Sequence, residues 1–521
     1  MTLFATVVLA LALAFAYAAQ LARWLRVLQR EHYEPRSMTR FLGRWSAPPV
    51  AGASTSSARA GRRGLTVSHL LVAVAVVAAL VHANVVVDLA TVSYGLFCPV
   101  GLSIRGRTGP LRFTPRLRVV AASAIVVALA VSALGPLGTN PFLGAVVMVW
   151  AVPPVLDGLA RLLAPVERRR AQHFVDLARR RLEVVRPVVV AITGSYGKTS
   201  TKNYLAQLLT ADGAVVASPR SFNNRAGLSR AVNENLVDGT RVFIAEMGTY
   251  GPGEIRDLTE WLPPDIAVVT AIGPVHLERM GSLEVIEAAK REITERAKTI
   301  VLNVDDVRLR SWVEELRNHG HRVVTAAARG SGDVRVEVAD GSWTLWVGDD
   351  QIGTGTMVVG VHATNLACAA AASLELGVSP AALVERLSAV TPSASRLSVA
   401  RAPSGVVVVD DTFNANPDSA RAALAVLGTL DVTGRRVVVT PGMVELGALQ
   451  YAENVRLAER IRATPADLVV VGRTNALPLS EGSPSPVMRF DRRDQAVAWV
   501  KKNLRDGDAV LYLNDLPDHY P

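Results

Sequence analysis

Long apolar runs, confined to the first third of the chain, constrain its fold most, because a run of bilayer length can satisfy its backbone in lipid only as a helix. Residues 2–22, 117–135 and 141–163 are three such runs. The stretch 65–104 exceeds one helix and has the length for two crossings. We therefore expect residues 1–165 to form a transmembrane helical region with four to five crossings.

Arginine clusters beside these runs predict the orientation. Arginines crowd at 23–63, 105–118 and 161–181, and clusters of this kind stay on the cytoplasmic side. An even number of crossings then separates the first two clusters, so that 65–104 enters and leaves the membrane as a hairpin or a re-entrant segment. A cleaved signal peptide is the alternative for the first run, but no basic residue precedes it. We expect a multi-pass protein of the cell membrane with its C-terminal part in the cytoplasm.

Composition narrows the possible partners. The net charge of +10 would suit nucleic acid, but aromatic residues make up only 5% of the chain. The arginines lie beside apolar runs, which favours contacts with membrane lipid headgroups and no nucleic-acid partner. Cys98 and Cys368 are the two cysteines, and both lie in apolar segments. They are expected to be buried apolar side chains in a reducing compartment.

A phosphate-binding loop follows the membrane region. Val188–Ile192 is a β-branched run typical of a buried strand, and Thr199–Leu209 has helical periodicity. The candidate nucleotide-binding residues lie in the loop between this strand and the helix and at the start of the helix. They are Gly194, Ser195, Gly197, Lys198, Thr199 and Ser200. The glycines let backbone N–H groups converge on phosphate oxygens, Lys198 reaches the outer phosphates, and the Thr199 hydroxyl is a ligand for Mg²⁺. The pattern predicts a nucleotide site.

Lysines are rare in this chain. Of 56 basic residues, only six are lysines: Lys198, Lys202, Lys290, Lys298, Lys501 and Lys502. A sequence that uses arginine wherever a positive charge suffices makes each retained lysine a candidate for chemistry that needs an amine.

The compact string T-G-x-x-G-K-T-S-T resembles the Mur ligases and the folylpolyglutamate synthases, with Ile192 where the general phosphate loop has its first glycine. Downstream, SFNNRAGLSRAVNENL resembles the asparagine-rich loop of the ligases that add D-alanyl-D-alanine to a muramoyl tripeptide. This resemblance implies substrate contacts from Asn223 and Asn224. It also implies that Glu246, at a strand end, holds Mg²⁺.

The resemblance further implies a second Mg²⁺ site. In the family, the residues at the positions of His276 and Lys290 serve this metal, and the lysine is carbamoylated to become a carboxylate-like ligand. A surface lysine on a helix is the alternative for Lys290. Two Mg²⁺ ions suit the transfer of a phosphoryl group from ATP to a carboxylate, because they offset the repulsion between the oxygens.

Three further strings extend the resemblance along the chain. Gly360–Asn365 resembles the adenine-contacting segment, one residue shorter, and implies that Asn365 contacts ATP. Ser395-Arg396-Leu397 resembles a G-R-L string and implies that Arg396 reaches the ATP phosphates as a catalytic residue beside Lys198, His276 and Lys290. Asp410–Ser419 resembles D-D-x-[YF]-N-A-N-P-D-S, which implies a ribose contact for Asp411 and substrate contacts for Asn414 and Asn416. A helix-capping turn is the alternative reading of the asparagines.

The organisation expected is α/β, with N-terminal transmembrane helices followed by a phosphate-loop Mur ligase central domain and a Rossmann-like C-terminal domain. Strands at Val406–Val409, Arg436–Thr440, Leu468–Val471 and Ala509–Leu513 alternate with helical segments in the last of these. The expected bounds are 1–165 for the transmembrane region, 166–186 for a basic juxtamembrane helix, 187–371 for the central domain and 372–521 for the C-terminal domain.

Two departures from the family pattern bear on the substrate. The family's N-terminal UDP-binding domain has no counterpart, since membrane segments stand in its place, so the carboxylate substrate is expected to be lipid-linked or held by a partner. The family's K-G-S-R-type segment is replaced by Asn514–Pro521, NDLPDHYP, which is either a ragged terminus or a repurposed site.

The function expected is an ATP-dependent ligase that forms an amide through an acyl phosphate. It would add an amino acid or a dipeptide such as D-alanyl-D-alanine to a cell-wall precursor at the membrane. Two alternatives stay open: a ligase for another envelope polymer, and a carboxylate-activating subunit of an amidotransferase complex.

Overall fold

The computed structural model describes residues 2–31, 33–34, 36–46, 71, 73–75, 77, 84–99, 102, 104, 111–133, 140–219, 222–392, 397–412, 415–483, 487–514 and 520. The chain divides into two compact units. The first comprises Met1–Arg169 together with Gly472–Leu477 and Leu516–Pro521, and the second comprises Arg170–Val471 together with Pro478–Asp515.

The first unit is helical. Its helices are α1 (Leu3–Arg30), α2 (Ser37–Ser46), α4 (Asn84–Phe97), α5 (Pro115–Ala133) and the first part of α6 (Leu143–Val185). Helices α1, α5 and α6 are long and apolar enough to cross a membrane, and the three apolar runs noted in the sequence fall on them. Within 65–104 the structure describes α4 and a few helical residues before it, so the number of crossings there stays a prediction.

Polar side chains of α1 cap the end of α4. Gln20 Nε2 donates to the carbonyl of Cys98 at 2.6 Å, and Arg23 Nη1 donates to the carbonyl of Gly95 at 2.6 Å. The last carbonyls of a helix have no partner within that helix, so these bonds satisfy groups that would otherwise need another partner. Apolar side chains near the start of α1 point outward instead, with Phe4 79% and Phe15 68% exposed.

Helix α6 is continuous over 43 residues. The expected span at 141–163 and the expected juxtamembrane helix at 166–186 are therefore parts of one helix, which contains Pro165. From Arg170 onward the helix belongs to the second unit, where Val175 and Ala178 are buried in the core of the central domain.

The central domain is built on a nine-stranded sheet with the order β2-β3-β1-β4-β5-β6-β7-β8-β9. Its strands are β1 (Val188–Thr193), β2 (Val215–Ala217), β3 (Val242–Glu246), β4 (Ile266–Val269), β5 (Thr299–Asn303), β6 (Arg322–Ala327), β7 (Val334–Ala339), β8 (Ser342–Val347) and β9 (Asp350–Thr356). Neighbouring strands from β2 to β7 are parallel, and β8 and β9 add as antiparallel strands that the sequence did not lead us to expect. The strand β1 and the helix α7 that follows it confirm the predicted strand–loop–helix unit.

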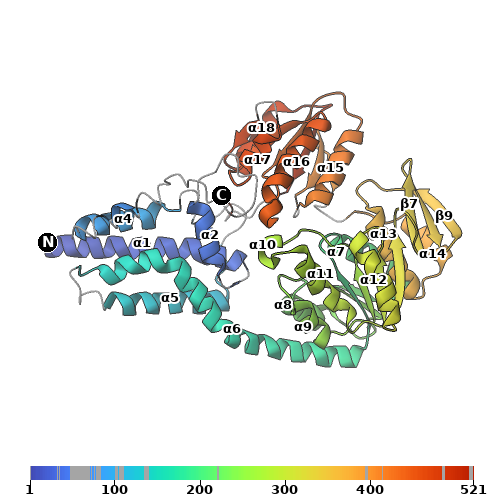
Figure 1. Cartoon of the computed structure of the whole chain (residues 1–521), viewed down its shortest axis with the longest axis horizontal. Helices are drawn as coiled ribbons and strands as arrows, with labels where there is room; N and C mark the ends of the chain where they lie inside the picture. The colour runs from blue at the N-terminus through green and yellow to red at the C-terminus, as the bar shows by residue number, and fades with distance from the viewer. Residues whose placement is uncertain are drawn as a thin grey trace. The chain divides into compact units, whose positions relative to one another are not determined.

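Helices cover both faces of this sheet (Figure 1). One face packs against the end of α6, α8 (Arg225–Asn235), α9 (Glu254–Trp261) and α12 (Val307–Asn318). The other packs against α7 (Lys198–Leu209), α13 (Ala363–Glu375) and α14 (Pro380–Leu387). Two short helices, α10 (Leu277–Met280) and α11 (Leu283–Arg291), follow β4. In such doubly wound sheets, ligands bind at the carboxyl ends of the strands.

The C-terminal domain has a six-stranded sheet with the order β10-β11-β15-β12-β13-β14. The strands are β10 (Ser398–Arg401), β11 (Val407–Asp411), β12 (Arg436–Thr440), β13 (Asp467–Val471), β14 (Met488–Phe490) and β15 (Ala509–Leu513), and the helices are α15 (Pro417–Thr429), α16 (Gln450–Ala463), α17 (Ala476–Glu481) and α18 (Arg493–Asn503). All pairings except that of β10 are parallel. Three of the four strands predicted here are confirmed within one residue at each end, and the fourth, predicted at Val406–Val409, lies at Val407–Asp411.

The end of the chain leaves β15 through Asn514. This residue has a left-handed backbone (φ 64°). Its Nδ2 donates to the Gly442 carbonyl at 2.6 Å and its Oδ1 accepts from the Ala415 backbone N–H at 3.2 Å. In the first unit, the ring of Tyr520 lies edge-on to Phe41 with 5.3 Å between centroids. Residues 515–519 and 521 lie outside the described residues, and a substrate role for NDLPDHYP stays a prediction.

Candidate active site

The phosphate loop lies between β1 and α7. Gly194 and Gly197 have φ values of 147° and 78°, which side chains disfavour. A Cβ atom on Gly197 would lie only 2.2 Å from Asn365 Oδ1. Only glycine fits there, and the close approach places the expected adenine-contacting residue, at the start of α13, directly against the loop.

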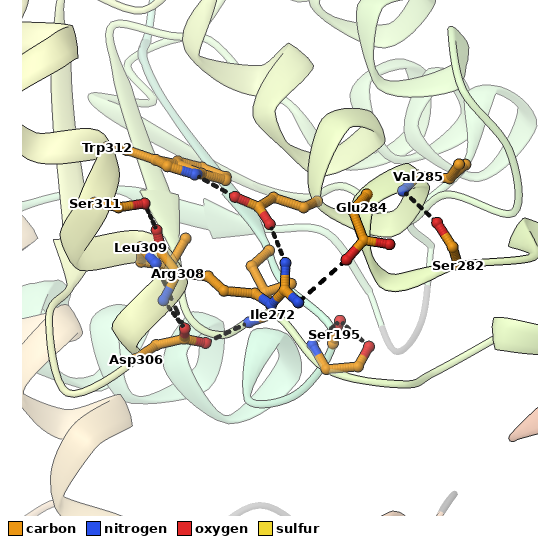
Figure 2. A network of polar contacts seen from close by, with 12 residues as sticks. Ser195, Ile272, Ser282, Glu284, Val285, Asp306, Arg308, Leu309, Ser311 and Trp312 are labelled. Carbon is orange, nitrogen blue, oxygen red and sulfur yellow. Dashed lines mark hydrogen bonds and ion pairs between the residues drawn. The ribbon is translucent and has the colours of Figure 1, made fainter. Parts of the chain in front are cut away.

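Side chains of the loop fix its shape. Lys198 Nζ folds back to donate to the Gly194 carbonyl at 2.6 Å. Ser195 Oγ donates to the Gly273 carbonyl at 3.0 Å and accepts from the Gly273 N–H at 2.9 Å, which joins the loop to the segment after β4 (Figure 2). Ser200, also expected at the nucleotide, is buried in the first turn of α7.

The segment after β4 is held in turn by α12. Asp306 Oδ2 accepts from the Ile272 N–H at 2.7 Å, while its Oδ1 caps α12 by accepting from the Arg308 N–H at 2.9 Å (Figure 2). Arg308 then pairs with Glu287 at 2.6 Å and with Glu284 at 3.3 Å. The loop that carries Gly273 is therefore bound on one side to the phosphate loop and on the other to a capped helix.

Three side chains converge on Glu246 at the end of β3. Thr199 Oγ1 donates to Glu246 Oε2 at 2.9 Å, and Lys202 Nζ lies 3.1 Å from the same oxygen. Asn223 Nδ2 donates to Oε1 at 3.3 Å. Thus Thr199 and Glu246, the two residues expected at the first metal, are in direct contact beside the phosphate loop.

Charge keeps the Glu246 carboxyl ionised. Burial alone would raise its pKa, but the ammonium groups of Lys202 and Lys198 and the hydrogen bonds from Lys202 and Thr199 hold the pKa below its usual value. The sequence did not assign Lys202 a role. Its only signals were the rarity of lysine and its place one helical turn after Lys198.

Lys290 is buried near the end of α11, with 4% of its surface exposed. Burial lowers its pKa well below the usual value, and the positive charge of Lys198 lowers it further. Among the described residues, the structure gives Lys290 Nζ no ion pair or hydrogen bond. A lowered pKa favours the neutral amine, which is the nucleophilic form, and the burial of this side chain contradicts the alternative of a solvated surface lysine.

His276 contacts the C-terminal domain. Its Nδ1 is hydrogen-bonded to Glu445 Oε2, and its ring lies 4.8 Å from the ring of Tyr250. Arg279 Nη2 lies 3.7 Å from Glu445 Oε1. The sequence gave no sign of this partnership, which joins residues 169 positions apart.

The remaining expected residues have other contacts. Asn224 caps α8 by accepting from the Gly227 N–H, and Asn416 caps α15 by accepting from the N–H groups of Asp418 and Ser419. Asp411 Oδ1 accepts from the Leu397 N–H at 3.3 Å. Arg396 and Asn414 lie outside the described residues. The capping alternative is thus confirmed for Asn416, Asn224 caps a helix as well, and the substrate contacts of both stay predictions.

One place in the site has side chains whose oxygen atoms suit a hard cation. Within the described part of the chain, no group of three or more His, Cys, Asp or Glu side chains has metal-site geometry. The Thr199 hydroxyl and the Glu246 carboxylate offer the oxygen ligands that Mg²⁺ prefers, next to a phosphate loop that would supply the rest through the nucleotide.

The fold and the site define a class of protein, the ATP-dependent ligases with a phosphate loop. The defining features are the phosphate loop on a doubly wound sheet, the carboxylate and hydroxyl pair beside it, and the second α/β domain. Residues 192–374 match the Mur ligase middle domain, and residues 395–513 match the Mur ligase glutamate ligase domain. The chain belongs to the Mur ligase family and is an ATP-dependent ligase that forms an amide bond.

Relatives and solved structures agree with this assignment. The UDP-N-acetylmuramoyl-tripeptide–D-alanyl-D-alanine ligase of Mycobacterium tuberculosis is 34% identical over 357 residues, covering 62% of this chain and 69% of the relative. The ligase of the same name from Bacillus subtilis is 27% identical over 355 residues, covering 65% of this chain and 75% of the relative. The MurF ligase of Thermotoga maritima, solved with ADP, is 27% identical with a TM-score of 0.58 and covers 66% of this chain and 80% of that structure.

Proposed function

We propose that this chain adds an amino acid or a dipeptide, such as D-alanyl-D-alanine, to the carboxylate of a cell-wall precursor. The names of the two relatives supply the substrate class. The observation that carries the proposal is the convergence of Thr199, Lys202 and Asn223 on Glu246, beside a complete phosphate loop. This arrangement suits transfer of a phosphoryl group to an acid.

The proposed reaction has two steps. An oxygen of the substrate carboxylate attacks the γ-phosphorus of ATP, the bond to ADP breaks, and an acyl phosphate forms. The incoming amine then attacks the acyl carbon, loses a proton and expels phosphate. Lys198 would hold the outer phosphates of ATP, with Arg396 adding a second positive charge, and Asn365 would contact adenine.

Mg²⁺ would offset the charge that builds up on the transferred phosphoryl oxygens. Thr199 and Glu246 would hold one ion, and His276 and a carbamoylated Lys290 would serve a second. The burial and lowered pKa of Lys290 support this role, because only an unprotonated amine attacks CO₂. Asn223 would orient Glu246, and Asp411 would contact the ribose.

The proposed site of action is the cell membrane. Helices α1, α5 and α6 have the length and composition to span it. Outward-facing apolar side chains on α1 and α5 support contact with lipid, among them Leu11 at 66% and Leu129 at 66% exposure. The arginine clusters support a cytoplasmic position for the ligase domains. The membrane helices would stand where the family has its UDP-binding domain, so that the carboxylate substrate is presented at the membrane, either lipid-linked or by a partner.

Phosphate release by the full chain in detergent tests the reaction. Amino acids and dipeptides are paired with soluble UDP-linked and with lipid-linked muramoyl peptides, and product masses are recorded. Lys198→Ala serves as the blank, and Lys298→Ala is the matched control because that side chain is 82% exposed. Turnover with D-alanyl-D-alanine and a muramoyl tripeptide supports the proposal and shows which carrier is used. Wild-type protein that binds ATP yet turns over no pair contradicts it.

Labelling tests the topology. Both native cysteines are buried, so a maleimide should label only a cysteine that is introduced at an exposed position. We expect Asp238→Cys in whole cells to resist a membrane-impermeant maleimide until the membrane is opened. Labelling in intact cells would place the ligase domains outside and overturn the cytoplasmic assignment.

A further inference from the structure

One cluster of side chains joins the two ligase domains. Tyr250, His276 and Arg279 come from the central domain and Glu445 from the loop after β12 in the C-terminal domain. The two oxygens of Glu445 are divided between partners, with Oε2 bonded to His276 Nδ1 and Oε1 lying 3.7 Å from Arg279 Nη2. The Arg279 guanidinium also lies 4.9 Å from the ring centre of Tyr250.

The backbone of this contact is unusual as well. His276 and Glu445 have φ values of 57° and 64°, in the left-handed region that few residues other than glycine adopt. The Glu278 N–H donates to the Glu445 carbonyl at 3.3 Å, so the two loops also meet through their main chains. Backbone of this kind persists where the surrounding contacts require it, which is common at functional sites.

The bond to Glu445 fixes which ring nitrogen of His276 is available. A proton on Nδ1 that is donated to the carboxylate leaves the lone pair on Nε2. Among the described residues, no protein group is bonded to Nε2. The ring is therefore held by one nitrogen and offers the other to a ligand.

We propose that Glu445 is a positioning residue, which orients His276 only when the C-terminal domain closes on the central domain. Closure delivers the carboxylate, the carboxylate sets the tautomer and direction of the imidazole, and Arg279 holds the carboxylate in place. The effect of this orientation on Mg²⁺ binding by His276 rests on the proposed function. The contacts of Glu445 with His276 and Arg279, called the latch below, do not, because they are made by the chain's own residues.

Distance measurement by pulsed electron paramagnetic resonance tests the latch without turnover. Spin labels are attached to the full chain in detergent at Glu314→Cys and Asp506→Cys, whose native side chains are 80% and 79% exposed. Glu445→Ala is expected to lower the closed-to-open ratio with ATP by about tenfold, as loss of a charged hydrogen bond predicts. Asp467→Asn, which removes an exposed pair with Arg435 in the same domain, should leave the ratio unchanged. Equal ratios for Glu445→Ala and this control would overturn the latch.

Kinetics test the orientation of His276. Glu445→Gln should lower kcat and raise the Mg²⁺ concentration for half-maximal rate, while KM for ATP stays within about twofold because the phosphate loop is untouched. A rise in KM for ATP with unchanged kcat and Mg²⁺ dependence would contradict a role through His276. Wild-type protein without turnover would count against the proposed function alone, since the distance measurement still reports on the latch.

Discussion

Lys202 Nζ lies 3.1 Å from Glu246 Oε2, and each of these side chains is only 2% exposed. Both ions have lost their water, so each depends on the other for compensation. The pair joins the first turns of α7 to the end of β3, directly below the phosphate loop. It therefore links the stability of the central domain to the place where the nucleotide is expected.

Removing one member of this pair should be costly. Lys202→Met leaves the Glu246 carboxylate buried without its ion-pair partner, and we expect the free energy of unfolding to fall by about 3–5 kcal/mol. Denaturant unfolding of the full chain in detergent measures the change. The double variant Lys202→Met, Glu246→Gln should recover part of the loss, because no buried charge remains. Strictly additive losses would show that the two residues are not coupled.

Substitution of Lys198, unlike that of Lys202, should affect activity strongly and stability little. Its ammonium is bonded to the backbone carbonyl of Gly194, and its side chain is only partly buried. We expect Lys198→Met to abolish phosphate release while changing the free energy of unfolding by no more than about 1 kcal/mol. The same unfolding measurement, run beside Lys202→Met, checks this. An equally large loss of stability would mean that Lys198 is structural.

Gly273 is packed against Tyr196 of the phosphate loop. A Cβ atom on Gly273 would lie 2.4 Å from Tyr196 Cε2 and 2.6 Å from its hydroxyl oxygen. Gly273→Ala should therefore push the loop from its position, weaken ATP binding at least about tenfold and destabilise the fold by about 1–3 kcal/mol. Calorimetric titration with ATP measures the affinity. The second-site change Tyr196→Ala removes the clash, and failure of this change to restore affinity would refute the packing argument.

The Cys368 thiol should be inert in the folded protein. Burial raises its pKa from 9.0 to about 12, and Asp305 adds to the rise. At pH 8.5 the thiolate fraction is then roughly 1000-fold below that of a free thiol. Iodoacetamide should label this residue only after unfolding, as mass spectrometry of digests would show. Because the folded pKa is raised, the group also favours folding below pH 9 and loses that contribution as pH rises toward 12.

What the sequence could predict was mostly local. The β-branched run before the glycine-rich loop, and the periodicity after it, predicted β1 and α7 because both signals lie within a few residues of one another. The pair Lys202–Glu246 and the pair His276–Glu445 span 44 and 169 residues, and no local pattern encodes them. They depend on the strand order that brings the ends of β3 and β1 together and on the docking of a second domain.

Helix ends were the harder local problem. Asn224 and Asn416 stand in strings that imply substrate contacts, yet both side chains cap helices. An asparagine before a helix satisfies the capping rule whatever else it does, so sequence alone left both readings open for Asn416, and the same rule accounts for Asn224. Likewise, the change from an apolar to an arginine-rich composition near residue 165 led to the expectation of a span and a separate juxtamembrane helix, but the structure has one continuous helix there.

Lys290 offers a test in which pH and carbon dioxide act together. Its folded pKa lies well below 10.5, so between these two values the unfolded chain holds a proton that the folded chain lacks. The contribution of Lys290 to the free energy of unfolding must then rise with pH up to about 10.5. In CO₂-free buffer we expect Lys290→Met to be more stable than wild type at pH 7, with the difference shrinking toward pH 10. Lys298→Met, at an exposed lysine, should show no such trend.

If Lys290 is carbamoylated, bicarbonate should make the wild type more stable than Lys290→Met. A carbamate replaces the buried amine by an anion that metal can bind, so at pH 8 with Mg²⁺ and bicarbonate the wild type should gain stability and Lys290→Met should not. Carbon-13 bicarbonate should give a carbamate resonance in wild type that is missing in Lys290→Met. A stability gain shared by both proteins, or a resonance that survives the substitution, would assign the effect to another group.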